Sequence, residues 1–308
     1  MLEFEFDVEP EYEGFRIDKC IAENYTEFSR SFIQKQIKDG FVSLNNKKAK
    51  ASLSVSSGDK ILFIVKDPLQ VDIVAENIPI DILYEDEDVI VVNKPKGMVV
   101  HPAPGHFSGT LVNALMYHLK DNLSGINGEL RPGIVHRIDM NTTGSLIVCK
   151  NDKAHNMIAA QLKDHSLNRR YVAICHGVFK ESEGRIVTTI GRHPKDRMKM
   201  AVNVNGGKEA ITNYKVLEQF ENCALVELKL ETGRTHQIRV HMAHINHPVA
   251  GDDIYSNQKI KIKTDGQALH AKILGFIKPS DNTYIETEAP LPEYFVKLLD
   301  NLRKGMKL

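Results

Sequence analysis

The stretch "GIVHRIDMNTTGSLIVCK", residues 133–150, carries a single carboxylate between two apolar runs. The runs are Gly133–Ile138 and Ser145–Cys149, and the polar interruption between them predicts a buried β-hairpin with Asp139 at its tip. An Asn-Gly pair would serve an ordinary hairpin turn. An acid at this position therefore indicates either a turn-forming side chain, which is common for aspartate in loops, or a functional carboxylate.

The composition is typical of a globular protein, with 42% hydrophobic residues in a chain of 308. No apolar run approaches the roughly 18 residues of a membrane span, and the acidic start at residues 1–14 is unlike a secretory signal. The four cysteines form no C-x-x-C pair. We therefore expect a cytoplasmic protein with reduced thiols and no membrane partner.

The formal net charge is zero, which argues weakly against nucleic acid, but the charges are clustered. Residues 1–27 hold nine acidic and two basic side chains, whereas residues 28–50 hold six basic and one acidic. Residues 163–200 hold nine basic and four acidic side chains. Such local basic surfaces can bind a phosphate backbone within a neutral chain, although a solvated charged face is the ordinary alternative.

The first part of the chain predicts a small domain over residues 13–67, after an acidic segment 1–12 and before a linker at 68–80. Its expected elements are helices at 16–25 and 29–40, a strand at 41–50 interrupted by an Asn-Asn turn, and a strand at 58–65. Three basic residues face outward on the second helix and are candidates for binding phosphates, or are scattered surface charges: Arg30, Lys35 and Lys38.

The larger domain is expected over residues 81–308. Its pattern predicts a hairpin at 82–95, helices at 110–120, 152–165 and 235–246, and a strand at 169–179. Strands outnumber helices and follow one another directly, which favours antiparallel pairing and an α+β fold over a doubly wound sheet.

The helix at 235–246 is expected to begin at Thr235 as N-cap, after a tight entry at Gly233. A metal-dependent hydrolase is one interpretation of its histidines, but the H-E-x-x-H spacing and an acidic ligand are missing, so we predict no metal site. The histidines concerned are His236, His241, His244 and His247.

Arg239 lies on the inner side of this helix, among small residues, where a half-buried guanidinium needs an anion. Asp139 is the candidate, because a bidentate arginine would keep a buried carboxylate ionised and fixed. A solvated surface pair is the alternative. No phosphate-binding loop, dinucleotide fingerprint or serine-hydrolase elbow is present, so we expect cofactor-free chemistry carried by a carboxylate.

"HRIDMNTTGSLIVCK" resembles the signature of the RluA-type pseudouridine synthases. Stretches at 91–102, 169–177, 230–255 and 269–276 resemble that family in the same order and spacing, so the likeness covers about residues 80–295. The small domain resembles an S4 RNA-binding domain. The resemblance implies an α+β fold with a mixed, mainly antiparallel sheet flanked by helices, and an enzyme without cofactor or metal.

The resemblance also assigns roles to individual residues. It implies that Asp139 is the catalytic aspartate, that Tyr171 stacks on the target base and that Arg239 pairs with the aspartate. RNA-contacting positions are expected at His136, Arg137, Thr143, Arg169, Arg234 and His236.

The implied activity is the isomerisation of uridine to pseudouridine in structured RNA, with the base flipped into a pocket. The substrate expected from the resemblance is 23S ribosomal RNA, free or within pre-50S particles, with the enzyme acting as a monomer. A tRNA-directed synthase and a non-catalytic S4-type ribosome-assembly factor are alternatives. The sequence leaves open whether Asp139 attacks C1′, attacks C6 or removes the C2′ proton.

Overall fold

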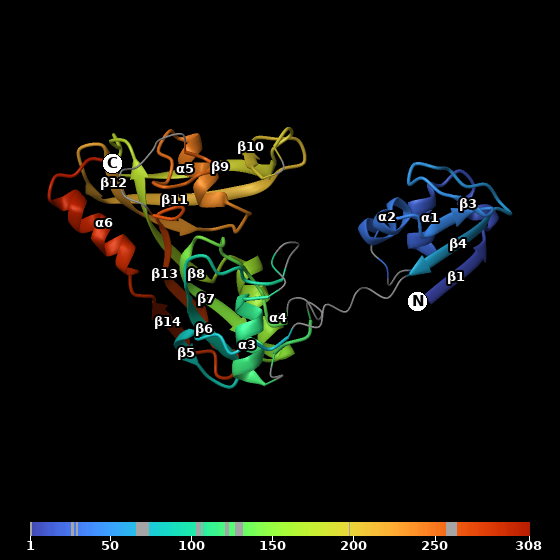
Figure 1. Cartoon of the computed structure of the whole chain (residues 1–308), viewed down its shortest axis with the longest axis horizontal. Coiled ribbons are helices and arrows are strands. Elements are labelled where there is room, and N and C mark those ends of the chain that lie inside the picture. Colours follow the sequence, from blue (N-terminus) through green and yellow to red (C-terminus); the bar gives the residue numbers. More distant parts are fainter. Residues whose placement is uncertain are drawn as a thin grey trace. The chain divides into compact units, whose positions relative to one another are not determined.

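The chain folds into two compact units, Met1–Asp72 and Ile73–Leu308, in the computed structural model (Figure 1). Within the described part of the chain, every helix is too short or too polar to cross a bilayer. The structure describes residues 2–308 except 26–27, 29, 66–73, 103–105, 107, 121–122, 127–131, 197 and 257–263.

The first unit combines two helices with an antiparallel sheet of order β1-β4-β2-β3. Its core contains Ile17 and Ile21 from one helix, Ile33 and Ile37 from the other, and Phe63 from the sheet. The elements are β1 (Leu2–Asp7), a 3-10 helix (Pro10–Tyr12), α1 (Ile17–Asn24), α2 (Arg30–Lys38), β2 (Val42–Leu44), β3 (Lys47–Lys48) and β4 (Lys60–Val65).

The Asn-Asn turn is confirmed: Asn45 and Asn46 both have positive φ, 48° and 63°, as a tight hairpin between β2 and β3 requires. The acidic segment 1–12 is not separate from the small domain, because its first residues form β1 and pair along the whole of β4. Of the expected linker, residues 68–73 lie outside the described residues, and 74–80 have no regular structure.

The second unit is built on one large sheet of order β10-β9-β11-β12-β8-β13-β7-β6-β5, with β14 on β13. Among the described strand pairs, β7 and β13 alone run parallel, so the predicted mixed, mainly antiparallel α+β fold is confirmed. The strands are β5 (Asp81–Glu85), β6 (Val89–Lys94), β7 (Thr143–Cys149), β8 (Asn168–His176), β9 (Glu183–Arg192), β10 (Met200–Val202), β11 (Lys208–Gln219), β12 (Cys223–Leu230), β13 (Leu269–Ile277) and β14 (Tyr284–Glu288).

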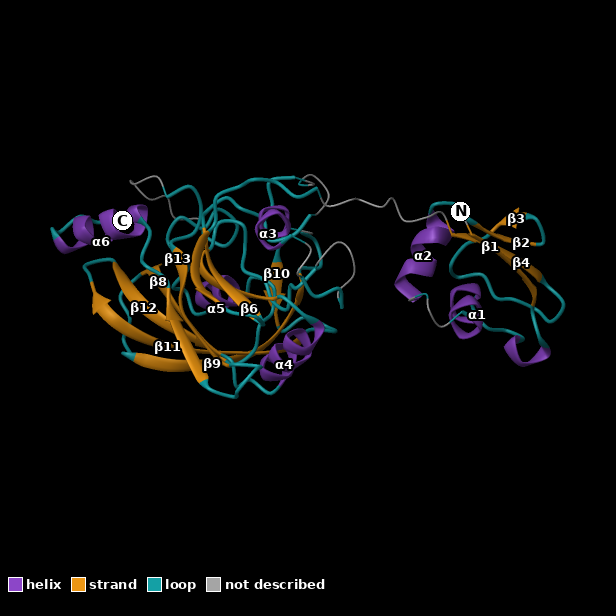
Figure 2. Ribbon diagram, turned by 90° about the horizontal axis from the view of Figure 1, so that it is seen from below, coloured by secondary structure: helices purple, strands orange, loops and turns teal. Residues whose placement is uncertain are grey.

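The helices of this unit cover the curved sheet shown in Figure 2. Helix α4 (Asp152–Lys163) packs on β7 and β13, and α5 (Gln237–His244) packs on β10 and β11. Helix α3 (Leu111–Leu119) begins at Thr110, whose side chain forms a capping box with Asn113. Helix α6 (Glu293–Arg303) packs near the C-terminus, where Phe295 and Leu298 are buried.

The hairpin predicted over residues 133–150 is wrong in its first arm. Only the second arm is a strand, β7, and β7 pairs with β6 on one side and with β13 on the other. Residues 133–138 contribute one isolated bridge, from Ile134 to Val148. The strand that flanks β7 near Asp139 thus comes from more than a hundred residues later, which a local pattern cannot indicate.

Candidate active site

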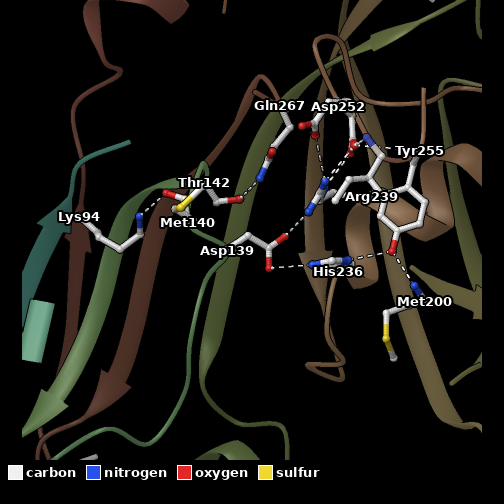
Figure 3. A network of polar contacts seen from close by, with 12 residues as sticks. Lys94, Asp139, Met140, Thr142, Met200, His236, Arg239, Asp252, Tyr255 and Gln267 are labelled. Atoms are coloured by element: carbon white, nitrogen blue, oxygen red, sulfur yellow. Dashed lines mark hydrogen bonds and ion pairs between the residues drawn. The ribbon is translucent and has the colours of Figure 1, made fainter. Parts of the chain in front are cut away.

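Asp139 lies in a loop just before β7, and the backbone around it is held from several directions. The carbonyl of Met140 accepts hydrogen bonds from the ammonium group of Lys94 at 2.9 Å and from the backbone of Gly97 at 3.0 Å. Gln267 donates to the hydroxyl of Thr142 at 3.0 Å. These contacts come from distant segments, so the carboxylate is presented by a rigid loop (Figure 3).

The ammonium group of Lys94 is fully buried and donates to three backbone carbonyls, those of Pro95, Met98 and Met140, at 2.8–2.9 Å. Burial lowers the pKa of Lys94 to about 7, and the nearby carboxylate of Asp139 opposes that shift. Lys94, the last residue of β6, therefore connects the loop that carries Asp139 to the end of that strand through a hydrogen bond.

Arg239, on α5, confirms the predicted contact with Asp139 but not its bidentate form. Its Nη1 donates to Asp139 Oδ2 at 3.0 Å. The fork formed by Nε and Nη2 is instead directed to Asp252, at 2.7 and 2.9 Å. Burial alone would lower the pKa of Arg239, but the two carboxylates raise it well above its usual range. Arg239 is thus permanently charged and bound by two acids.

Asp252 was not identified from the sequence, although it is the fully buried partner of this network. Its Oδ1 also accepts the backbone N–H groups of Ile254 and Tyr255 at 3.0 Å each. The neighbouring Asp253 is exposed and 3.9 Å from Arg239. Two adjacent acids follow Gly251 in the sequence, and nothing local distinguishes the buried one from the exposed one.

His236 lies on the other side of the Asp139 carboxylate, with Nε2 3.9 Å from Oδ1 (Figure 3). The Tyr255 hydroxyl accepts the N–H of Met200 at 2.7 Å and lies 2.8 Å from His236 Nδ1. Its own proton is therefore free for Nδ1, which assigns the imidazole proton to Nε2, facing Asp139. Burial lowers the pKa of His236, so the ring is neutral at pH 7.

The backbone at His236 differs from what the sequence predicted, because α5 begins later than expected. His236, rather than Thr235, is the residue before α5, and it has a left-handed φ of 56° without a side-chain cap. Gln237 satisfies the local donors instead, because its side-chain oxygen accepts from Arg234 N and Thr232 Oγ1 at 2.9 Å.

A cavity of about 530 Å³ opens in front of Asp139. Tyr171, on β8, contributes to its wall and is only 7% exposed. Burial raises the pKa of the Tyr171 phenol. Arg239, His236 and Arg169 also line the cavity. A flat aromatic ring, a carboxyl group and basic side chains therefore surround one space large enough for a nucleoside.

Comparison with known proteins identifies the family of the chain. The family model described as RNA pseudouridylate synthase matches residues 88–244. The chain belongs to this family. It is a pseudouridine synthase.

Curated relatives match along nearly the whole synthase. An uncharacterized RNA pseudouridine synthase of Bacillus subtilis, YlyB, is 50% identical over 305 residues, 99% of this chain and all of the relative. A ribosomal large subunit pseudouridine synthase D of Pseudomonas aeruginosa is 41% identical over 99% of this chain and 97% of its own.

A solved human structure, RNA pseudouridylate synthase domain containing 1, superimposes with a TM-score of 0.56 at 26% identity, covering 77% of this chain and 98% of that one.

Two positions expected to contact RNA also have structural partners within the synthase. His136 accepts the backbone N–H of Ile147 with Nε2 at 3.1 Å, and burial lowers its pKa to about 3, so the ring is neutral. It lines the cavity but its Nε2 is already used. Thr143 is buried in β7, where its hydroxyl lies 2.8 Å from His270 Nδ1, and it is not part of the cavity wall.

The expected arginines of the site do lie together. Arg137, Arg169 and Arg234 line the cavity with Asp139. Arg137 is exposed, and Arg234 is half-buried with its Nε donating to the carbonyl of Glu209 at 2.8 Å. Arg169 is buried. The stretches 169–177 and 230–255 of the sequence thus meet at one cavity.

In the first unit, Lys35 and Lys38 are exposed on α2, as predicted. Arg30 differs, because its guanidinium donates from Nε and Nη2 to the carboxylate of Asp18 at 3.1 and 3.2 Å. Arg16 donates to the same buried carboxylate at 3.0 and 3.2 Å. Arg30 is about half exposed and is held in place by Asp18.

The histidines of α5 do not converge. His241 is buried, with its two ring nitrogens 2.9 Å from the hydroxyls of Thr188 and Thr212. His244 is exposed, and His247 Nδ1 contacts the carbonyl of His176 at 2.8 Å. Among the described residues, no group of three or more His, Cys, Asp or Glu side chains is arranged to hold a metal ion. All four cysteines are buried and free.

Proposed function

We propose that this synthase isomerises uridines in the RNA of the large ribosomal subunit. The support is its extensive similarity to relatives that are named for that activity, over 91–99% of this chain. In the reaction, the N1–C1′ bond of the target uridine breaks and a C5–C1′ bond forms. The hydrogen on C5 leaves to solvent, and N1 takes up a proton.

The single observation that carries the site assignment is the asymmetry of the Asp139 carboxylate. Oδ2 accepts from Arg239 at 3.0 Å, whereas Oδ1 accepts no hydrogen bond within the described residues and lies 3.9 Å from His236 Nε2. Arg239 fixes the position of Oδ2, and Oδ1 is left for the nucleotide. Tyr171, across the same cavity, would stack on the uracil while it is detached and turned.

The first unit would bind the RNA outside the cavity. Its two helices, antiparallel sheet and exposed basic residues on α2 support the S4-type assignment. Lys35 and Lys38 are free to contact phosphates, and Arg30 would contact them from a position fixed by Asp18. We expect a monomeric enzyme that meets ribosomal RNA or pre-50S particles in the cytoplasm.

The test is the release of tritium from C5-labelled uridine in transcripts of 23S RNA and of tRNA. We expect release from the 23S transcript, and Asp139→Asn should abolish it because the amide cannot act as nucleophile or base. Asp253→Asn, which alters an exposed acid near the same site, should retain wild-type turnover. Turnover of Asp139→Asn within tenfold of wild type would refute the role of Asp139, and release from tRNA alone would refute the ribosomal substrate.

A further inference from the structure

Arg169, on β8, is a buried cation that has no anionic partner among the residues that the structure describes. Arg169 is only 6% exposed, and its Nε has no hydrogen-bond partner among the described residues. Nη2 makes one long contact, 3.5 Å to the carbonyl of Glu231. The carboxylate of Glu231 is not available, because it accepts from Arg185 at 3.0–3.1 Å and from Asn213 at 2.8 Å.

Such an arrangement is costly for the folded protein. A buried charge normally pairs with an opposite charge or with several hydrogen-bond acceptors. Burial lowers the pKa of Arg169, and no carboxylate among the described residues compensates for it. This differs from Arg239, which lies in the same cavity wall and contacts two carboxylates.

The fold nevertheless makes room for this guanidinium at the cavity. A Cβ added to Gly233 would lie 2.7 Å from Arg169 Nη1, so the absence of a side chain there lets the guanidinium pack against the backbone. Arg169 and Gly233 both line the cavity. The missing partner of Arg169 can therefore come from a ligand in that space.

We propose that Arg169 binds a phosphodiester group of the target nucleotide; this inference rests on the proposed function. Arg169 and Tyr171 are two residues apart on β8, so they face the same side about 7 Å apart along the strand. A nucleotide whose base stacks on Tyr171 presents its own phosphate within that span. Phosphate oxygens would satisfy the guanidinium, which binds such groups with parallel N–H donors.

The proposal predicts an effect of replacing Arg169 on stability that differs from the effect expected if Arg169 only supported the fold. If Arg169 is retained for the ligand, replacing it with an apolar side chain of similar length removes an uncompensated buried charge. Arg169→Met should then unfold in urea at or above the wild-type midpoint, while RNA affinity falls. If Arg169 instead supports the fold, the midpoint should fall together with the affinity.

Binding is measured with the full chain and an unlabelled 23S transcript, over a series of KCl concentrations. We expect Arg169→Met to bind roughly five- to twentyfold more weakly at low salt, with the slope of log K against log [KCl] reduced by about 0.7–0.9, as loss of one phosphate contact predicts. Arg170→Met is the matched control, because it removes the same charge from the next residue, which does not line the cavity. Its slope should equal that of wild type.

Gly233→Ala gives a second perturbation that keeps the charge. The added methyl group displaces Nη1, so the RNA affinity of Gly233→Ala should fall, as it does in Arg169→Met. The double variant Arg169→Met/Gly233→Ala should bind RNA no more weakly than Arg169→Met alone. Additive losses would show that the two positions act separately and would overturn the proposal.

The remaining outcomes are also decisive. Unchanged affinity and salt slope with lower turnover would mean that Arg169 stabilises the detached uracil anion, and the phosphate proposal would be wrong. A lowered urea midpoint in Arg169→Met would overturn it as well. Absence of tritium release by wild type would instead refute the proposed function, whatever the variants of Arg169 bind.

Discussion

The replacement of Asp252 by Asn tests whether the second acid holds the arginine of the site. Asp252 accepts from Arg239 through both oxygens and, through Oδ1, from the backbone of Ile254 and Tyr255. An asparagine would place its oxygen at Oδ1 to keep the three bonds there. Its NH₂ group would then face Arg239 Nε at the position of Oδ2, donor against donor.

The magnitude follows from burial. The Asp252 side chain is 0% exposed, and breaking a buried ion pair by removing one partner costs about 3–5 kcal/mol. Because Asn keeps several of the bonds, we expect a loss near the lower end, about 3 kcal/mol, in the free energy of unfolding. Arg239 should also turn toward Asp139, engage both of its oxygens and lower turnover by about a hundredfold.

The assay is urea denaturation followed by circular dichroism at pH 7, together with tritium release. Asp253→Asn is the control, since that side chain is 74% exposed and 3.9 Å from Arg239. Its stability should change by less than about 0.5 kcal/mol, as at most surface positions. If Asp252→Asn also stays within that range and keeps its turnover, Asp252 does not orient Arg239.

Three further predictions follow from the same contacts. Arg239→Lys should lose at least a hundredfold in tritium release, because an ammonium group cannot serve the fork to Asp252 and the bond to Asp139 together; near-normal release would contradict this. Tyr171→Leu should weaken RNA binding by the roughly 1–3 kcal/mol of one stacked base, whereas Tyr171→Phe should keep it; equal affinities would exclude stacking. Burial raises the pKa of Asp18, but hydrogen bonds from Gln34 and two arginines lower it to about 2 from 3.8, so its stabilisation is present above pH 3.8 and is lost as the pH falls toward 2. This lowered pKa is worth about 2 kcal/mol, so Asp18→Asn should be less stable than wild type by about that much at pH 6 and by little at pH 2; a difference independent of pH would contradict this.

Elements that depend on neighbouring residues were predictable from the sequence. The Asn45–Asn46 turn, the hairpin of β5 and β6, and helix α3 each form from residues that are close together in the sequence. The first arm of the 133–150 hairpin was wrong because β7 finds its partner in β13, far along the chain. Local periodicity reports which residues are buried, not which strand covers them.

The candidate site was predictable in its chemistry and less so in its connections. An inward arginine required an anion, and Asp139 is one of its two partners. The fork partner, Asp252, was missed because it differs from Asp253 only in burial. His136 and Thr143, which were expected to contact RNA, have internal partners that the sequence did not indicate: His136 Nε2 accepts a strand N–H, and the Thr143 hydroxyl contacts His270. Such assignments depend on tertiary neighbours that the sequence does not place.

The division of Arg239 between two acids reconciles two demands on the Asp139 carboxylate. A carboxylate that reacts with a nucleotide must be ionised and fixed, yet one oxygen must keep its lone pairs free. A bidentate arginine would occupy both oxygens. Asp252 accepts hydrogen bonds from both Nε and Nη2 of Arg239, which holds the guanidinium rigidly and leaves only Nη1 for Asp139. This single bond fixes Oδ2 and leaves Oδ1 without a hydrogen bond within the described residues, 3.9 Å from His236 Nε2. If Asp139 has the proposed catalytic role, the buried Asp252 therefore determines how the Asp139 carboxylate is presented.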